Sequence, residues 1–170
     1  MREIQLNGKK AAGRVALVDD EDYELMSGHS WHVWEQHRPG RHRATGPYAC
    51  AAIRRDDGTL RHVYMHQLIT RWPITDHANG DGLDNRRSNL RPVDHAQNNW
   101  NSAKRGGGTS RFKGVSWRER DGKWQVHITV SGKRRFLGCF ASEEDAAAAY
   151  TAAALEIQGQ YAYAARDLTA

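Results

Sequence analysis

The chain has 170 residues, a net charge of +5 at pH 7 and a pI of about 9.4. This length fits one ordinary domain or two small ones, and the basic excess is consistent with a polyanionic partner. Cys50 and Cys139 lie far apart, which excludes a disulfide framework and a cysteine-rich zinc site. No apolar run approaches the roughly 18 residues of a membrane span, and no signal peptide is evident. We expect a soluble protein in a reducing compartment.

The N-terminal part of the chain is strand-rich. Short apolar runs bounded by turn residues predict strands, Asp56-Asp57-Gly58 predicts a hairpin turn, and Pro73 should end a short helix. In chain order we expect a strand over 14–18, a turn or short helix ending at Leu25, a strand around 31–34, a mobile loop over 37–46, strands over 48–53 and 60–64, and a helix over 65–71.

The segment 76–91 places an imidazole beside a carboxylate, then an Asn/Gly turn and several guanidinium groups, and the amide-rich stretch 95–99 follows. Phosphodiester hydrolysis uses a base, metal ligands and phosphate-facing cations together. His77 suits the base because the ordinary histidine pKa is about 6.5. Asp76 and the amide oxygen of Asn98 suit a divalent cation whose other ligands are water and phosphate. The segment therefore predicts a one-metal nuclease site.

This pattern resembles the HNH endonucleases, particularly their phage and intron homing branch, whose site is a ββα-metal fold. The resemblance implies that Asp76 and Asn98 hold Mg²⁺ or Mn²⁺. It also implies that His77 is the general base, with Asn89 bracing the loop as part of the catalytic constellation. His95, about one helical turn before Asn98, is the alternative metal ligand.

Structural roles stay open beside these functional ones. The segment 76–91 could be only an Asx-rich surface loop, and His66, which matches a histidine upstream of the site in this branch, could equally be a buried structural residue. The basic side chains expected at the phosphate, or alternatively in solvent, are Arg86, Arg87 and Arg91.

Three consecutive glycines within 102–110 predict a linker. We place it between a nuclease domain over 1–101, with its ββα core at about 64–101, and a second domain over 111–166. From residue 101 to 140 ten Lys or Arg stand against Glu119 and Asp121, which favours nucleic acid. The expected elements are strands over 113–118, 123–130 and 133–140, turns at 120–122 and 131–132, and a helix that Ser142 caps and Gly159 ends.

Apolar and polar residues alternate along the middle strand of this second domain, so the strand has an apolar face and a polar face. Trp124, Val126 and Ile128 should pack on the helix, against alanines and a tyrosine expected at Ala146, Ala149, Tyr150 and Ala153. The opposite face should meet the DNA major groove. Its expected DNA-binding residues are Lys113, Arg118, Lys123, Gln125, His127, Thr129 and Arg134, with Trp117 or Phe136 as a further candidate.

The motifs Phe-Lys-Gly-Val at 112–115, Gly-Lys-Trp at 122–124 and Phe-Leu-Gly-Cys-Phe at 136–140, together with Glu-Glu-Asp-Ala-Ala at 143–147, resemble the plant ethylene-response-factor (APETALA-type) DNA-binding domain. That resemblance implies DNA reading by the sheet. Several positions where the plant proteins carry base-reading Arg, Trp or Glu differ here, so affinity for DNA carries over better than a recognition sequence. These positions are Ser116, Asp121, His127 and Thr129.

The expected fold class is α+β: a ββα-metal HNH domain with a strand-rich N-terminal part, and a three-stranded antiparallel sheet packed on one helix. The expected function is metal-dependent hydrolysis of double-stranded DNA by a phage or mobile-element endonuclease, nicking as a monomer or weak dimer. It would work in the cytoplasm of a bacterial host cell, with no membrane partner. Two alternatives remain: a non-catalytic sequence-specific DNA-binding regulator with a nuclease-like scaffold, and a nuclease acting on RNA or junctions.

Overall fold

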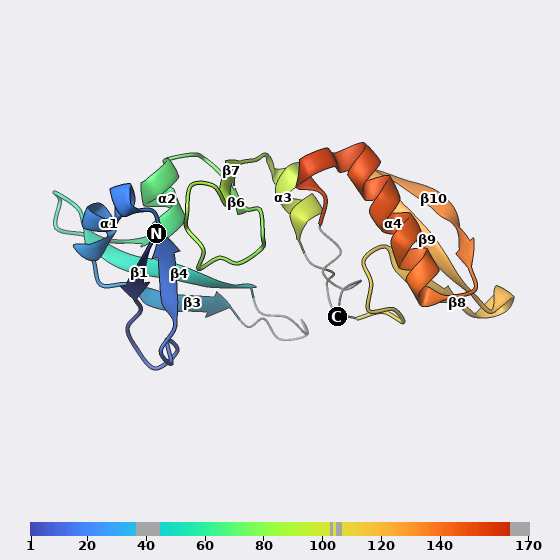
Figure 1. Ribbon diagram of the computed structural model, residues 1–170, viewed down its shortest axis with the longest axis horizontal. Helices are drawn as coiled ribbons and strands as arrows, with labels where there is room; N and C mark the ends of the chain where they lie inside the picture. Colours follow the sequence, from blue (N-terminus) through green and yellow to red (C-terminus); the bar gives the residue numbers. More distant parts are fainter. Residues whose placement is uncertain (37–44, 103, 105–106, 164–170) are drawn as a thin grey trace. The chain divides into compact units, whose positions relative to one another are not determined.

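A computed structural model describes residues 1–36, 45–102, 104 and 107–163 (Figure 1). The chain forms two compact units, and the division along the main chain falls between His95 and Ala96. The first unit is described over 1–36 and 45–95, and the second over 96–102, 104 and 107–163. Both contain antiparallel strands and helices, which confirms the α+β prediction. No helix of the described residues is long and apolar enough to cross a membrane.

The first unit is built from three small antiparallel sheets and two short helices (Figure 1). The strands pair as β1-β2, β3-β4-β5 and β6-β7. The elements are β1 (Arg2–Gln5), β2 (Val15–Val18), α1 (Asp20–Ser27), β3 (His32–Gln36), β4 (Thr45–Arg54), β5 (Leu60–Tyr64), α2 (Met65–Thr70), β6 (Thr75–His77) and β7 (Leu90–Pro92). The predicted strands over 14–18, 48–53 and 60–64 are confirmed within a few residues.

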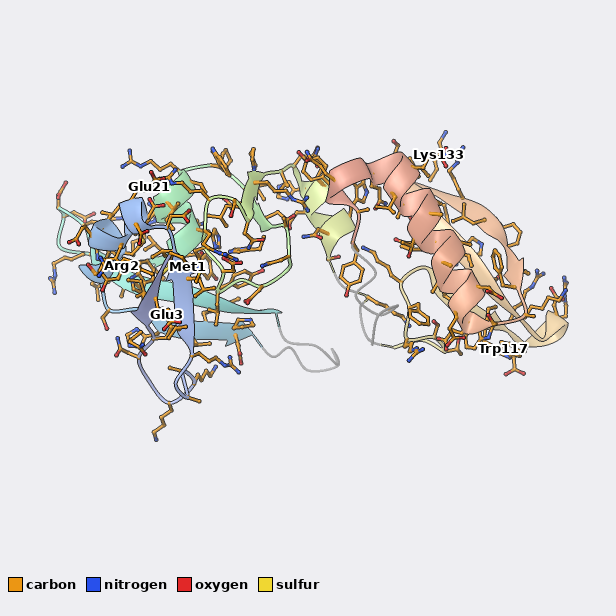
Figure 2. The ribbon with its side chains drawn as sticks, viewed as in Figure 1. Met1, Arg2, Glu3, Glu21, Trp117 and Lys133 are labelled. Carbon is orange, nitrogen blue, oxygen red and sulfur yellow. The ribbon has the colours of Figure 1, made fainter. Side chains whose placement is uncertain are left out.

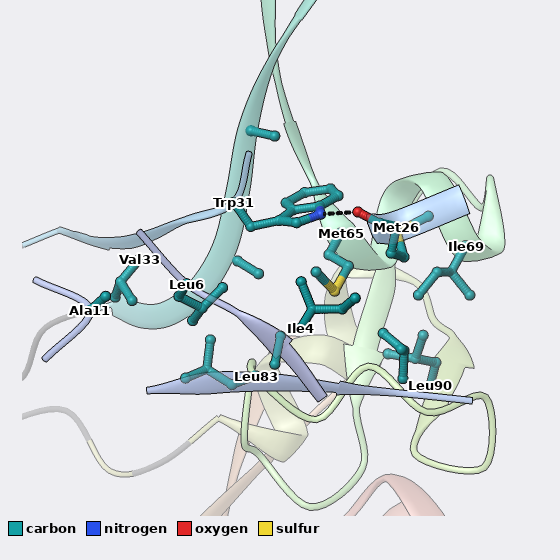
Figure 3. Packing of buried hydrophobic residues seen from close by; sticks show 14 residues of the cluster. Ile4, Leu6, Ala11, Met26, Trp31, Val33, Met65, Ile69, Leu83 and Leu90 are labelled. Carbon is teal, nitrogen blue, oxygen red and sulfur yellow. Dashed lines mark hydrogen bonds between the residues drawn. The ribbon is translucent and has the colours of Figure 1, made fainter. Parts of the chain in front are cut away.

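The core of this unit gathers around Trp31, whose side chain is fully buried (Figure 3). Its indole Nε1 donates a 2.7 Å hydrogen bond to the backbone oxygen of Met26 at the end of α1. Met65, the first residue of α2, and Ile4 of β1 belong to the same cluster. A buried indole needs such an acceptor, so this bond positions α1 against the sheets.

The predicted helix over 65–71 is confirmed as α2, which ends one residue earlier. Pro73 was expected to stop the helix, but Arg71 already adopts a left-handed conformation with φ 56°. The N–H of Arg71 donates to the backbone oxygen of Gln67, which satisfies a carbonyl of the last turn. The predicted loop over 37–46 lies outside the described residues except for its last two, which begin β4.

The second unit consists of a three-stranded antiparallel sheet, in the order β10-β9-β8, with one long helix along it (Figure 1). The short helix α3 (His95–Asn101) precedes it, and all its residues except His95 belong to this unit. The other elements are β8 (Val115–Arg118), the 3₁₀ turn η1 (Glu119–Asp121), β9 (Lys123–Val130), β10 (Lys133–Phe140), α4 (Glu143–Gln158) and the 3₁₀ turn η2 (Gly159–Tyr161).

The apolar face of β9 packs on α4, as alternation predicted. Val126 and Ile128 are almost completely buried, together with Ala146 and Tyr150 of the helix. Ala147 and Ala154 are buried as well, whereas the expected contacts Ala149 and Ala153 are only partly buried, so the buried stripe is rotated from the predicted one. The small helical residues allow the helix to lie close to the sheet.

Local signals in this unit produce the expected turns and cap. Ser131 and Gly132 both have positive φ, 49° and 75°, which suits a two-residue hairpin turn between β9 and β10. The hydroxyl of Ser142 accepts a 3.0 Å hydrogen bond from the N–H of Asp145, as an N-cap does. Gly159 is the C-cap of α4.

The last residue of the predicted linker is part of the second unit. The Ser110 side chain is buried, and its hydroxyl donates a 2.6 Å hydrogen bond to Oε1 of Glu143. The same hydroxyl accepts from the N–H of Phe112. These bonds hold residue 110 at the start of α4. The segment after the glycines is therefore ordered by side-chain contacts, which its Gly-rich composition did not predict.

Candidate functional site

Asp76, predicted as a metal ligand, is one half of a buried ion pair. Its Oδ2 accepts hydrogen bonds from Nε and Nη2 of Arg91, at 2.9 and 2.7 Å. The two residues face each other across the β6-β7 ribbon, and their side chains are only 8% and 15% exposed. A buried carboxylate requires such a partner. The pair therefore has a structural role in the β6-β7 ribbon, whether or not Asp76 also binds a metal ion.

His77, predicted as the general base, lies in a cluster of rings and is 4% exposed. Its ring centroid is 5.1 Å from that of His66 and 5.7 Å from that of Tyr48. Its Nε2 lies 3.5 Å from Oδ1 of Asn85. Burial lowers the pKa of His77, opposed by the hydrogen bond to Asn85 and by nearby carboxylates. Burial and the neighbouring His77 lower the pKa of His66 to about 3.

Asn89 closes the loop between β6 and β7. Its Oδ1 accepts from the N–H of Asn79 at 2.9 Å, and its Nδ2 donates to the backbone oxygen of Asp84 at 2.7 Å. The side chain of Asn79 in turn donates to Oδ2 of Asp84. These bonds satisfy the polar groups of a loop whose middle, residues 82–85, is buried.

The three arginines of this segment are all paired with carboxylates. Arg86 binds Asp84 with two hydrogen bonds of 2.7 and 2.6 Å, which lower the pKa of Asp84. Arg87 also forms a bidentate contact: its Nε and Nη2 donate to the two carboxylate oxygens of the buried Asp22 of α1, at 2.9 and 2.7 Å. With Arg91 held by Asp76, each guanidinium stabilises the first unit. Their binding of phosphate stays a prediction.

Asn98 and its alternative His95 lie on α3 and are exposed. Asn98 belongs to the second unit, whereas Asp76 belongs to the first. Among the described residues, no group of three or more His, Cys, Asp or Glu is arranged to hold a metal ion. The metal-ligand assignment of Asp76 and Asn98 stays a prediction.

The face of the second unit's sheet that points away from α4 carries most of the predicted DNA-binding residues. Directly paired residues in an antiparallel sheet share a face, and neighbours along a strand alternate. Because Val126 and Ile128 face the helix, their strand neighbours face away from it. We call this the open face. It comprises the cross-strand pairs Ser116–Gln125, Arg118–Lys123, His127–Phe136 and Thr129–Arg134, and Cys139 opposite Gln125.

Side chains on the open face contact one another. Gln125 Nε2 donates to Oγ of Ser116 at 3.2 Å. An Nη2 of Arg134 lies 3.1 Å from Nδ1 of His127. The ring of Phe136, which is 57% exposed, lies 5.2 Å from the ring of His127. The face therefore combines polar groups, cations and one exposed aromatic ring.

Charge differs between the sheet and the helix of this unit. From β8 to β10 six basic residues stand against Glu119 and Asp121 (Lys133 and Trp117 mark opposite ends of the sheet in Figure 2). Helix α4 contains no Lys or Arg and four acidic residues. A polyanion would therefore meet the sheet rather than the helix. The basic residues are Arg118, Lys123 and Arg134 on the open face, Arg120 in η1, and Lys133 and Arg135, which pair with Val130 and Ile128.

Lys113, also predicted to bind DNA, lies before β8 and caps α3. Its Nζ donates to the backbone oxygens of Trp100 at 2.7 Å, Ser102 at 2.8 Å and Asn99 at 3.2 Å. A cation is stabilised at a helix C-terminus by the free carbonyls and the helix dipole. The sequence contains no signal for this contact because it depends on how α3 folds back.

The His127–Arg134 contact was not predicted, although the sequence contained a signal for it. A two-residue turn at Ser131-Gly132 fixes the register of β9 and β10. That register places Arg134 opposite Thr129, diagonally next to His127.

No family model matches the chain. It is 41% identical over 64 residues to the AP2-like ethylene-responsive transcription factor CRL5 of Oryza sativa subsp. japonica, which is 36% of this chain and 10% of that protein. It is 28% identical over 155 residues to the AP2-like ethylene-responsive transcription factor PLT2 of Arabidopsis thaliana, which is 81% of this chain and 27% of the relative. With the ethylene-responsive transcription factor WRI1 of the same plant, identity is 34% over 64 residues, 36% of this chain and 15% of the relative.

These relatives contradict the main functional prediction. They are transcription factors, so the prediction of an HNH endonuclease from a phage or mobile element, and of an enzyme at all, is wrong. The alternative of an RNA or junction nuclease is wrong for the same reason. The prediction of a bacterial host is wrong as well, because the relatives are plant transcription factors. Over part of its length, the chain is similar to AP2-like ethylene-responsive transcription factors, as the motifs of its second domain predicted.

Proposed function

We propose that the protein is a sequence-specific regulator that binds double-stranded DNA through the open face of its β8–β10 sheet. The observation that carries this proposal is the uneven charge of the second unit: Arg118, Lys123 and Arg134 lie on the open face, whereas α4 has four acidic residues and no Lys or Arg. The similarity to ethylene-responsive transcription factors supports it. Such factors act by occupying DNA, which requires no chemistry at the bound site.

The open face offers both kinds of contact that sequence-specific binding needs. Lys123 lies beside Arg118 at one end of the sheet and can neutralise a phosphate, which releases counterions and makes binding depend on salt. Arg118 would exchange its 2.9 Å ion pair with Asp121 for a phosphate. Gln125 and Thr129 carry donors and acceptors that can reach base edges in the major groove. A sheet face is an established shape for major-groove reading.

The first unit fits the role of a scaffold in this proposal. Its polar residues Asp76, Arg91, Arg87 and Asp22 form two ion pairs, Asp76–Arg91 and Arg87–Asp22. These pairs give the four residues a structural role that requires no catalysis. Mg²⁺ or Mn²⁺ binding by Asp76 and Asn98 remains a separate proposal, in which the cation competes with the Arg91 guanidinium. Titration of the full chain with Mn²⁺, followed by the EPR signal of the free ion, tests it. Loss of Mn²⁺ binding in both Asp76→Asn and Asn98→Ala supports it, and binding unchanged in either variant refutes it.

The DNA-binding proposal is tested by two matched lysine variants of the full chain. Lys123 is exposed on the sheet of the second unit, and Lys10 is exposed in the first unit. Duplexes selected from a randomised library serve as the probe, and affinity is followed by fluorescence anisotropy at several salt concentrations. Lys123→Gln should weaken binding similarly for all duplexes and reduce the salt slope by about 1. Lys10→Gln should leave both unchanged.

The opposite results would refute the assignment of the face. Equal losses in Lys123→Gln and Lys10→Gln would mean that binding follows net charge alone. Absence of any salt-dependent binding to duplexes would reject the function itself.

A further inference from the structure

Three side chains at the centre of the open face form one connected group, which we call the His127 cluster: His127, Arg134 and Phe136. The guanidinium of Arg134 lies 3.1 Å from Nδ1 of His127. The ring of Phe136 lies 5.2 Å from the imidazole at an interplanar angle of 53°. His127 and Phe136 are directly paired across β9 and β10, so the backbone register holds the two rings together.

The contact with Arg134 fixes the tautomer of His127. A guanidinium has only donors, so Nδ1 must accept the hydrogen bond and cannot carry a proton. The imidazole is then neutral, and its proton is on Nε2. Burial, and then the positive charge of Arg134, lower the pKa of His127, in agreement with a neutral ring. The cluster therefore presents hydrogen-bond donors: the imidazole Nε2–H and the remaining N–H groups of Arg134.

This arrangement is organised before DNA binds. The hydrogen bond and the neighbouring Phe136 ring restrict the rotamers of two side chains that would otherwise be ordered only on binding. Restricting them in the free protein lowers the entropic cost of base recognition. A fixed tautomer also defines which base atoms His127 can bind. Its Nε2–H can bond only to an acceptor on the base, because two donors cannot form a hydrogen bond.

We propose that His127 and Arg134 act as one donor-only pair that selects guanine at one position of the DNA site. This inference rests on the proposed function. In the major groove guanine presents two acceptors, N7 and O6, whereas adenine adds an N6 donor beside its N7 acceptor and cytosine presents an N4 donor. A pair of donors therefore matches guanine and leaves cytosine with opposed donors. His127 is a specificity-determining residue because it both contacts the base and orients Arg134.

The experiment uses the full chain and a library of duplexes with a randomised centre. Selection with the wild type defines the preferred site, and the affinity ratio between guanine and cytosine is then measured at each position for each variant. Arg134→Gln and His127→Leu should reduce the guanine preference at the same position by about 10-fold, within the 1–3 kcal/mol of a good base contact. Preferences at the other positions should stay unchanged.

Two further variants distinguish reading from a structural role. In His127→Asn the amide oxygen takes the place of Nδ1 and can still accept from Arg134, so this variant should retain more of the guanine preference than His127→Leu. His62→Leu, at a histidine exposed on β5 of the first unit, should leave that position unaffected. Each preference is a ratio of two affinities of one preparation, so partial unfolding of a variant cancels.

The inference and the proposed function fail in different ways. If the wild type selects a site, but Arg134→Gln and His127→Leu alter different positions or lower all affinities equally, the paired reading is overturned and DNA binding stands. If His127→Asn loses as much guanine preference as His127→Leu, orientation of Arg134 through Nδ1 is overturned. If the wild type binds no duplex, both are rejected.

Discussion

Acidification from pH 7 to pH 5 should destabilise the first unit through His66. This histidine belongs to α2 and lies between the rings of Tyr64 and His77, at centroid distances of 5.5 and 5.1 Å. Burial, followed by the neighbouring His77, lowers its pKa from 6.5 to about 3. The unfolded chain has no such environment, so its histidine takes up a proton near the ordinary pKa.

The sign and size follow from proton linkage. Because the folded pKa lies below the unfolded one, the stability contribution is complete above pH 6.5 and is lost as the pH falls towards 3. At pH 5 the unfolded state has gained most of a proton that the folded state has not. The difference of about 1.5 pH units below the unfolded pKa corresponds to about 2 kcal/mol. His77, whose pKa is lowered too, acts in the same direction.

Urea unfolding at pH 7 and pH 5 measures this effect, with His66→Leu compared with the wild type. The variant removes the titrating ring, so the stability difference between wild type and variant should shrink by about 2 kcal/mol at the lower pH. His62→Leu is the matched control, since His62 is exposed on β5. A wild-type-to-His66→Leu difference that is the same at both pH values would refute the buried neutral state of His66.

One substitution in each unit tests a contact of its interior. Arg91→Met should cost the first unit about 3 kcal/mol in a urea titration because it leaves the buried Asp76 carboxylate without this partner; a loss below 1 kcal/mol would mean that Asp76 reaches water. Gly114→Ala should strongly lower the melting temperature of the second unit, since its Cβ would lie 2.2 Å from Cδ2 of Tyr150 at a φ of 76°. Gly122→Ala, with φ 57° and open space around the Cβ, should cost much less, and equal losses would contradict the close contact.

Much of the second unit could be predicted from its sequence because its signals are local. Ser131-Gly132 supplies the two positive φ angles of a hairpin turn, and the alternation of β9 identifies the buried face. Ser142, followed by three acidic residues, marks the start of α4. The same local register placed most of the predicted DNA-binding residues on the open face.

The function of the first unit could not be predicted in this way. We inferred catalysis because the pattern of Asp76, His77 and the following Asn and Arg residues resembles the HNH endonucleases. The structure provides one for each, an ion pair with Arg91 and a place in a ring cluster. Similarity to transcription factors then overturned the nuclease prediction.

The α+β class, the main strands and the capped helix could be predicted from local sequence, since period, turn and cap signals act over a few residues. The resemblance of the second domain also followed from short motifs. Tertiary structure alone decided that Arg87 pairs with Asp22, 65 residues away, and that Lys113 caps α3. The physical reason is that a charged side chain takes whichever partner the folded backbone brings within hydrogen-bond distance. Residue type specifies the need for a partner, whereas the fold selects which partner it is.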